Sequence, residues 1–379
     1  MQTVGQAWLV LELTGSGTAL GLVVALQFLP VLLFAPWGGV LADRFSKRKL
    51  LFITQTSAGT LALILATLVL TNTVTLWMVY VLASLLGIVN AVDNPTRQSF
   101  AFEMVGADNV RNAVTLNSTE VNLARIIGPA IAGIIIATIG IAFCFFLNAV
   151  SYGATLICLF LMRASELHLE KPLERVKGQL MQGFRYVWHT PLLRNTLIMM
   201  GIVGTFTFEF QVSLALMAKY TFAGDAHAYA LLMSSMGIGA VIGGLATAGR
   251  KRIVPQDLVW ISIGFGIAMM LASLAPSLTL GAAAMVIVGV CSLWFQSLGN
   301  SLLQLESVPN MRSRVMSLWS VAFMGSTPIG GPIIGWIGEY VNPRWGLAVG
   351  GMAALAAGLF GMIAMKNYLS SKPAKNMLA

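Results

Sequence analysis

The chain reads Gly38-Gly39-Val40-Leu41-Ala42-Asp43-Arg44-Phe45-Ser46-Lys47-Arg48-Lys49 between two apolar runs, residues 19–42 and 50–70. Each run has about the 20 residues that a helix needs to cross a bilayer. The stretch between them therefore predicts a tight turn at a membrane surface. Its cations favour the cytoplasmic side, because Lys and Arg in short loops resist translocation. Asp43 stands out, because a basic turn does not require an acid at the end of the upstream helix.

The composition excludes a soluble globular protein. Of the 379 residues 57% are hydrophobic and 10% are charged, whereas soluble domains carry about 25% charged residues. The formal charge of +9 comes from cations in short loops and not from a basic face, so we expect no nucleic-acid partner. The three cysteines lie in apolar runs, where small buried residues are the rule, and we expect no metal site.

We predict eleven membrane-spanning helices, over residues 19–42, 50–70, 76–98, 113–139, 141–161, 192–219, 229–249, 258–275, 278–305, 315–337 and 346–365. A further apolar segment, residues 4–13, is too short to cross a bilayer. It is either a first helix that lacks its N-terminal half or a helix that only dips into the membrane interface.

The positions of the cations set the predicted topology. If residues 4–13 are the first span, most of the 23 Lys and Arg fall into the loops and the tail on one side. That side is therefore the cytoplasmic one, and the C-terminus lies there. We expect a monomer with many spans in the bacterial cytoplasmic (inner) membrane.

The longest polar stretch divides the chain into four parts: a first bundle (1–161), a cytoplasmic linker (162–191), a second bundle (192–366) and a tail (367–379). In the linker, apolar residues recur every three or four positions and cations lie between them. This pattern predicts an amphipathic helix on the anionic lipid surface. Such a linker serves either as a tether or as a site.

The two halves of the chain resemble each other. Asn109-Val110-Arg111 recurs as Asn310-Met311-Arg312, and each copy leads into a span with a Gly-Pro pair, Gly128-Pro129 or Gly331-Pro332. Repeats in the same direction predict two six-helix bundles with a binding site between them near mid-membrane.

These residues resemble the major facilitator superfamily. The stretch 38–49 is similar to the family signature between helices two and three, with Ser46 in place of its second glycine. Segments 94–98, 112–118, 125–129 and 314–317 resemble the exporter branch that includes the enterobactin exporter and macrolide efflux pumps. The resemblance implies an all-α membrane protein with the major facilitator fold: two six-helix bundles in a pseudo-twofold repeat, with a truncated first helix.

The resemblance also implies a conformational lock at the basic turn. In the family, the acid that ends helix two meets the N-terminus of helix eleven, an interaction of up to roughly 2 kcal/mol. The lock residues would be Asp43, Arg44, Lys47, Arg48 and Asp93. The alternative is that the cations only fix the topology.

Ionisable groups inside spans are functional candidates, because burying a charge at the bilayer centre costs about 2.5–3.5 kcal/mol. Asp93, Glu120 and Arg125 lie in neighbouring spans and could form one buried network. Arg125 is either half of a structural ion pair or a coupling residue.

Glu209, in Phe208-Glu209-Phe210-Gln211, has no cationic neighbour in sequence. An apolar environment favours the neutral form of a carboxyl group. Glu209 and Gln211 are thus candidates for proton transfer or substrate contact. The alternative is a Glu209 that simply faces an aqueous cavity.

Proline and glycine inside two of the spans predict bends and close helix packing. The residues are Gly128, Pro129, Gly133, Pro328, Gly331 and Pro332. The first three resemble the family's antiporter motif, which implies that they seal the cavity; ordinary packing is the alternative. The arginine that drug–proton antiporters carry early in helix four is absent from residues 76–90.

We therefore predict a secondary active transporter that works by alternating access: a proton-coupled exporter of a small amphipathic molecule, siderophore-like or drug-like. The alternatives are an inward nutrient or lysophospholipid transporter or flippase of the same fold, and an intramembrane enzyme. The enzyme is disfavoured, because all three His lie outside the predicted spans. No P-loop motif is present, so ATP is not the driver, and we expect no cofactor.

Overall fold

The computed structural model describes residues 1–163, 167, 179–248, 254–308, 311–324 and 326–371. Every regular element in this part is a helix, which confirms the predicted all-α class. Nine of its helical segments are long and apolar enough to cross a membrane, and Leu123–Thr138 is apolar but shorter. By length and composition, this is the helix content of a multi-pass membrane protein.

The chain forms two compact units. Unit 1 comprises Met1–Arg175, Gln211–Ser234 and Pro328–Pro343, and unit 2 comprises Val176–Phe210, Ser235–Thr327 and Arg344–Ala379. Unit 1 thus combines most of the first half of the chain with two short segments of the second half.

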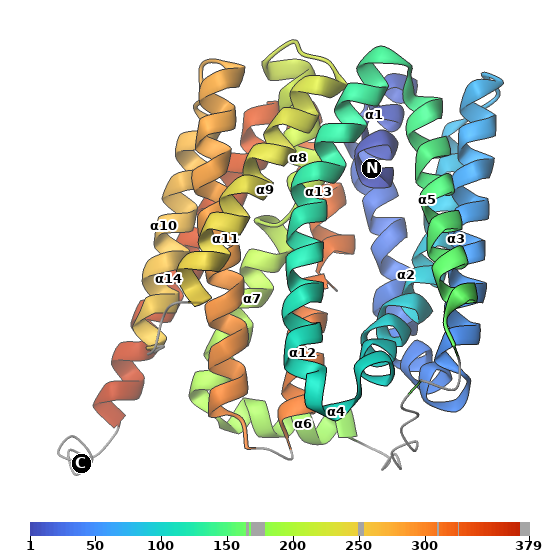
Figure 1. Cartoon of the computed structure of the whole chain (residues 1–379). Coiled ribbons are helices and arrows are strands. Elements are labelled where there is room, and N and C mark those ends of the chain that lie inside the picture. Colours follow the sequence, from blue (N-terminus) through green and yellow to red (C-terminus); the bar gives the residue numbers. More distant parts are fainter. Residues whose placement is uncertain (164–166, 168–178, 249–253, 309–310, 325, 372–379) are drawn as a thin grey trace. The chain divides into compact units, whose positions relative to one another are not determined.

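The first half of unit 1 contains α1 (Gln2–Thr14), α2 (Gly17–Arg44), α3 (Lys47–Leu70), α4 (Leu76–Thr138) and α5 (Ile141–Leu161). Within it α2 packs on α4, and α3 packs on α5, its neighbour in Figure 1. The short α1 is buried along most of its length and contacts α2, α4 and α5. The segment 4–13 is thus part of the packed interior of unit 1.

The helix α4 contains both predicted spans, 76–98 and 113–139, within 63 helical residues. Its part Leu76–Val105 is long and apolar enough to cross a membrane, and its part Leu123–Thr138 is the shorter apolar segment. The residues between the two spans contain one glycine, Gly106, and no proline. A strong helix breaker is therefore absent from the connection.

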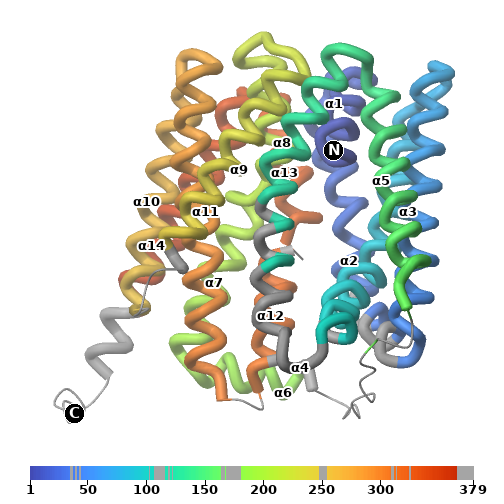
Figure 2. Tube along the Cα trace, viewed as in Figure 1, coloured from blue at the N-terminus to red at the C-terminus, as the bar shows by residue number. Residues whose placement is uncertain are grey.

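Unit 2 contains α6 (Gln179–His189), α7 (Pro191–Phe206), α10 (Pro255–Ser273), α11 (Leu278–Glu306), α12 (Arg312–Met324) and most of α14 (Pro343–Ser371). The helices α7 and α10 begin with proline, which suits the first helical turn because its missing N–H is not needed there. The helices α10 and α11 pack against each other and lie side by side in Figure 2. The helix α6 lies inside the predicted linker, of which residues 164–166 and 168–178 are outside the described part.

Two predicted spans are interrupted. Residues 192–219 are expected to form one helix, but α7 is followed by α8 (Phe210–Leu216) and by a π-helix, η2 (Met217–Thr221). Residues 315–337 are divided into α12 and α13 (Thr327–Tyr340). Both interruptions lie next to boundaries between the units, after Phe210 and after Thr327. The second-half segments of unit 1 are thus α8, η2, the start of α9 (Ala226–Ala248) and α13.

Candidate functional site

The main candidate site is the break between α7 and α8. Thr207, Phe208 and Glu209 are not helical, although the sequence there has neither glycine nor proline. The Thr207 hydroxyl donates a hydrogen bond to the Gly350 carbonyl of α14 at 2.8 Å. The break is thus held by a contact with another helix of unit 2. Discontinuous helices of this kind form substrate and ion sites in many transporters.

Aromatic rings surround the break. The Phe208 ring has its centroid 5.0 Å from that of Phe323 and 5.8 Å from that of Phe265. Phe210 lies 6.0 Å from Phe208, and Phe295 extends the cluster at 6.4 Å from Phe265. These edge-to-face and tilted pairs are geometries that aromatic rings prefer. They give the site apolar walls contributed by α8, α10, α11 and α12.

Glu209 is buried in these surroundings, with 1% of its surface exposed. The Thr327 hydroxyl hydrogen-bonds to its carboxyl group. The other oxygen, Oε1, has no hydrogen-bond partner among the described residues, and Glu209 is in neither of the ion pairs found there. An ionised carboxylate in this position is incompletely solvated, so a proton or a donor group of a ligand would complete it.

At the basic turn, the structure places the cations against their own half of the chain. Lys47 forms an ion pair with the buried Glu103 of α4. Arg48 donates from Nε to the Leu159 carbonyl at 2.9 Å and from Nη2 to the Phe160 carbonyl at 3.0 Å. These carbonyls end α5, where a cation is favoured. Lys47 and Arg48 thus fix the turn to α4 and α5.

Two further residues of the predicted lock, Arg44 and Asp43, lie at the end of α2. Arg44 is exposed at the end of α2. The side chain of Asp43, the central residue of the predicted lock, lies outside the described part. Its docking against a helix N-terminus stays a prediction.

Asp93 is a saturated carboxylate. It is 2% exposed, forms an ion pair with Arg97 one helical turn later, and accepts hydrogen bonds from Thr54 at 2.7 Å and Gln55 at 2.8 Å. Its oxygens therefore join α3 to α4.

Glu120 and Arg125 do not take part in that network. Both side chains are exposed, and neither is in an ion pair of the described residues. The expected network of Asp93, Glu120 and Arg125 is absent from this part of the structure. The partners of Asp93 are instead Arg97, one turn later in α4, and two residues of α3.

The predicted bends lie inside helices. Pro129 is within α4 and Pro332 within α13. A Cβ atom on Gly133 would lie 2.3 Å from the Ala230 Cβ of α9, so these two helices touch where glycine allows it. Gln211 contributes its carbonyl, which accepts from the Tyr229 hydroxyl at 3.2 Å.

Glu103 and Thr327, like Thr54 and Gln55, are partners in these contacts that are not predicted from the sequence. Glu103 follows Asp93 by ten positions and falls beyond the predicted end of its span. Thr327 is distant from Glu209 in sequence and becomes its partner only through the packing of unit 2.

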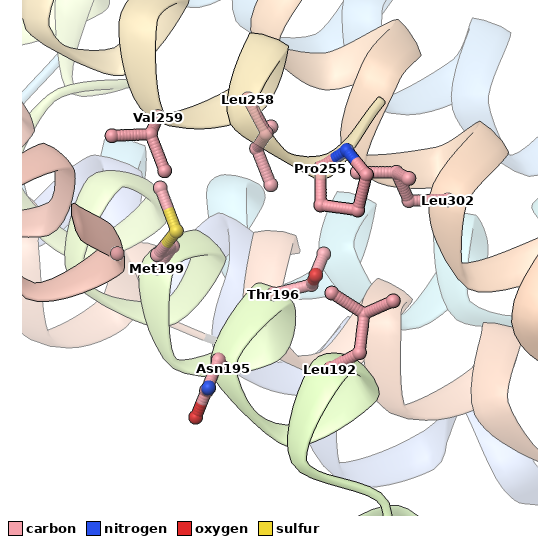
Figure 3. A pocket seen from close by; sticks show the side chains of 9 residues that line it. Leu192, Asn195, Thr196, Met199, Pro255, Leu258, Val259 and Leu302 are labelled. Carbon is pink, nitrogen blue, oxygen red and sulfur yellow. The ribbon is translucent and has the colours of Figure 1, made fainter. Parts of the chain in front are cut away.

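A small cavity lies elsewhere in unit 2, between α7 and α10 (Figure 3). Its volume is about 20 Å³, which suffices for one water molecule. Thr196 is a polar group on its wall, and Leu258 and Met199 close it. This cavity is too small for an organic substrate. The described residues also contain no cluster of His, Cys, Asp and Glu that could hold a metal ion.

The family follows from a comparison with known proteins. The model of a family described as "Transmembrane secretion effector" matches residues 1–377. The chain belongs to this family of major facilitator transporters. It is therefore a multi-pass membrane protein that moves small molecules.

Similar proteins include siderophore transporters. The staphyloferrin A transporter of Staphylococcus aureus is 26% identical over 320 residues, which cover 83% of this chain and 80% of that protein. The enterobactin exporter EntS of Salmonella choleraesuis is 25% identical over 356 residues, 93% of this chain and 82% of its own.

Solved structures confirm the fold. The nucleoside transporter NupG is 14% identical with a TM-score of 0.76, over 96% of this chain and 94% of its own. A bacterial homologue of the human lysosomal transporter Spinster is 13% identical with a TM-score of 0.73, over 98% and 94%. This likeness establishes the architecture and leaves the substrate to other observations.

Proposed function

We propose that the protein is a proton-coupled exporter of a small amphipathic molecule, siderophore-like or drug-like. The observation that carries this proposal is Glu209, a buried carboxyl group at a break in a membrane-spanning segment, with one oxygen that has no partner among the described residues. The Thr327 hydroxyl donates to it, but the apolar surroundings supply fewer donors than an ionised carboxylate needs. A substrate that donates a hydrogen bond or brings a positive charge would favour the ionised form.

This arrangement links a proton to a substrate through competition. When the substrate contacts Glu209, the carboxyl group releases its proton; when the substrate leaves, the proton returns. One group that binds either ligand, but not both at full strength, suffices for exchange in opposite directions.

The chemical class of the substrate is supported by the relatives and by the walls of the break. An enterobactin exporter and a staphyloferrin A transporter are similar over most of the chain. The phenylalanine cluster around Glu209 suits a molecule that has apolar or aromatic faces beside polar groups. The distribution of cations predicts which loops face the cytoplasm, the side from which an exporter binds its substrate.

The test is transport into inverted membrane vesicles with an acidic lumen, using enterobactin, staphyloferrin A and ethidium as probes. A gradient of one pH unit corresponds to about 1.4 kcal/mol per proton, so one proton per substrate drives roughly tenfold accumulation. We expect accumulation of at least one probe, and its loss when an ionophore collapses the gradient. Accumulation that survives the ionophore contradicts proton coupling; if no probe moves inward, the proposed class or direction is wrong.

The variant Glu209→Gln separates the roles of Glu209. If Glu209 is a proton carrier, the variant loses pH-driven accumulation but retains the exchange of labelled for unlabelled probe without a gradient. If Glu209 is only a substrate contact, the variant loses both activities. The matched control is Glu306→Gln, which makes the same change at an exposed carboxyl group at the end of α11 and should preserve both. Full activity in Glu209→Gln removes Glu209 from the mechanism.

A further inference from the structure

The turn between α1 and α2 presents two helix ends of opposite partial charge. The helix α1 ends at Gly15, which has a left-handed φ of 65°, and Ser16 caps α2 by accepting the Ala19 amide. The carbonyl end of α1 is negative and the amide end of α2 is positive. This turn lies at the end of α2 opposite to the basic turn, and we call that end the far end.

A carboxylate from the second half of the chain binds the positive helix end. Glu339, near the end of α13, accepts hydrogen bonds from the Ser16 hydroxyl at 2.7 Å and the Thr18 amide at 2.8 Å. Partial burial would raise the pKa of Glu339, but the hydrogen bonds from Thr18, Ser16 and Gly17 outweigh it and lower the pKa below its ordinary value. Glu339 therefore stays ionised at neutral pH.

Donors from the second half bind the negative helix end. The Lys219 ammonium group donates to the Leu11 carbonyl, and the Tyr220 hydroxyl donates to the Gly15 carbonyl. Both residues belong to the π-helix η2, a conformation that is frequent at functional sites. Each end of the α1–α2 turn thus has a partner of the complementary charge.

The backbones of α2 and α13 meet beside these contacts. A Cβ atom on Gly17 would lie 2.6 Å from the Gly335 carbonyl oxygen, and one on Gly21 would lie 2.3 Å from that of Gly331. Each helix therefore presents two glycines four positions apart, the spacing that lets helices approach closely in membranes.

We propose that Glu339, Lys219 and Tyr220 form a latch that closes the transporter at the far end and opens once in each transport cycle. The proposal rests on the transport activity proposed above. It concerns a contact of unit 1 that joins segments more than 300 residues apart, as Glu339 and Ser16 are.

The chemistry of the contact suits a latch better than a permanent joint. Glu339, Gly15 and Tyr220 are exposed, so water can replace the hydrogen bonds of Glu339 and Tyr220 when the helices separate. Asp93, by contrast, is enclosed by its partners and could not lose them without being left unpaired. The latch also mirrors the predicted lock. Glu339 lies near the end of α13 and caps the start of α2, whereas Asp43 ends α2 and is expected to cap the start of the predicted span 315–337, which begins in α12.

The experiment measures the far end directly. Spin labels replace Leu13 and Tyr340, which are exposed near the ends of α1 and α13, in a chain whose three cysteines are changed to alanine. Double electron–electron resonance in proteoliposomes then gives the distances between the labels. We expect a dominant short distance in the parent protein. In E339Q we expect the ratio of long to short distances to rise about tenfold, within the five- to thirtyfold that a contact of 1–2 kcal/mol represents.

Two further variants sharpen the result. E339D keeps the charge and should restore most of the short-distance population. D225N is the matched control, because the Asp225 carboxylate accepts hydrogen bonds only from amides at the start of α9, those of His227 and Ala228, among the bonds described. This variant should leave the distances unchanged.

The contact between Gly17 and Gly335 allows a second test at the far end. In G335A, the new methyl group would lie 2.2 Å from the Gly17 carbonyl oxygen, so α2 and α13 must separate and the long distance should increase. Unchanged distances in both E339Q and G335A would overturn the latch. The measurement needs neither a substrate nor a pH gradient, so it stays decisive if the proposed proton coupling fails.

Discussion

Asp93 and Glu209 are two buried carboxyl groups with opposite surroundings. Asp93 lies within α4 and Glu209 in the break between α7 and α8, and they expose 2% and 1% of their surface. Asp93 is bound by Arg97, Thr54 and Gln55. Glu209 has the Thr327 hydroxyl and an oxygen without a partner among the described residues. The same functional group is saturated in unit 1 and unsaturated in unit 2.

The difference teaches which buried charge can serve a transport cycle. A carboxylate whose oxygens are already bonded to donors has little left to offer another ligand. A carboxyl group with a free acceptor can exchange a proton for a substrate donor. We therefore read Asp93 as a structural joint between α3 and α4, and Glu209 as a group available for function.

The largest expected effect on stability is that of Asp93→Ala. This change removes an acceptor shared by three donors. The buried Gln55 amide loses its bond to Asp93, and Thr54 keeps only its longer bond to the Leu51 carbonyl at 3.2 Å. We expect a loss of about 3 kcal/mol, the low end of the cost of breaking a buried ion pair, because the Arg97 side chain is 60% exposed and can turn to water. Thermal unfolding in detergent, followed by size-exclusion chromatography, measures it as a lower midpoint.

The control for Asp93→Ala is Asp225→Ala, at an acid near the surface whose hydrogen bonds stay within the start of α9. It should cost only about 1 kcal/mol, as the loss of an N-cap does. Equal losses in the two variants would contradict the special role of Asp93 as a joint between helices.

Much of this comparison could be predicted from the sequence. Charges inside apolar spans are rare, so both acids are found by inspection. The Asp93–Arg97 pair also follows from its spacing of four, because residues one turn apart are neighbours on a helix. Thr54 and Gln55 could not be predicted, because they reach Asp93 from another helix, and helix rotation is set by packing.

The break at Glu209 illustrates the limit of sequence patterns. Residues 207–209 have no breaker, and the hydropathy of this stretch predicts one continuous span. The interruption depends on the bond from Thr207 to Gly350 and on rings contributed by three other helices. For the same reason the contact of Glu339 was not predicted, although Gly17, Gly21, Gly331 and Gly335 have the spacing of a helix-packing motif.

A smaller effect is expected when each carboxyl group loses one hydroxyl partner. Thr54→Val removes a donor to Asp93 and should cost about 0.6–1.7 kcal/mol, the range measured for hydrogen bonds between membrane helices. Thr327→Val makes the same change beside Glu209. It should cost less, because a Glu209 that becomes protonated no longer needs the donor.

Transport separates these two valine variants further. Thr54→Val should retain pH-driven accumulation in inverted vesicles, since Asp93 keeps its other partners. Thr327→Val should shift the pH at which accumulation is half-maximal, since it changes the surroundings of the group that exchanges protons. The same pH profile in both variants would argue against the difference between the two carboxyl groups.

The smallest effect on stability is expected for Glu209→Gln, the variant with the largest effect on transport. Glutamine has the shape of a protonated glutamate and carries no charge, so it suits a site that has no ion pair among the described residues. Its amide can accept from Thr327 as the carboxyl group does. We expect the free energy of unfolding to change by less than about 0.5 kcal/mol, as for substitutions that create no cavity and no unpaired charge, while Asp93→Asn loses more because its amide must face Arg97. If Glu209→Gln instead unfolds as readily as Asp93→Asn, its carboxylate has a structural partner, and the unsaturated oxygen cannot be the basis of proton exchange.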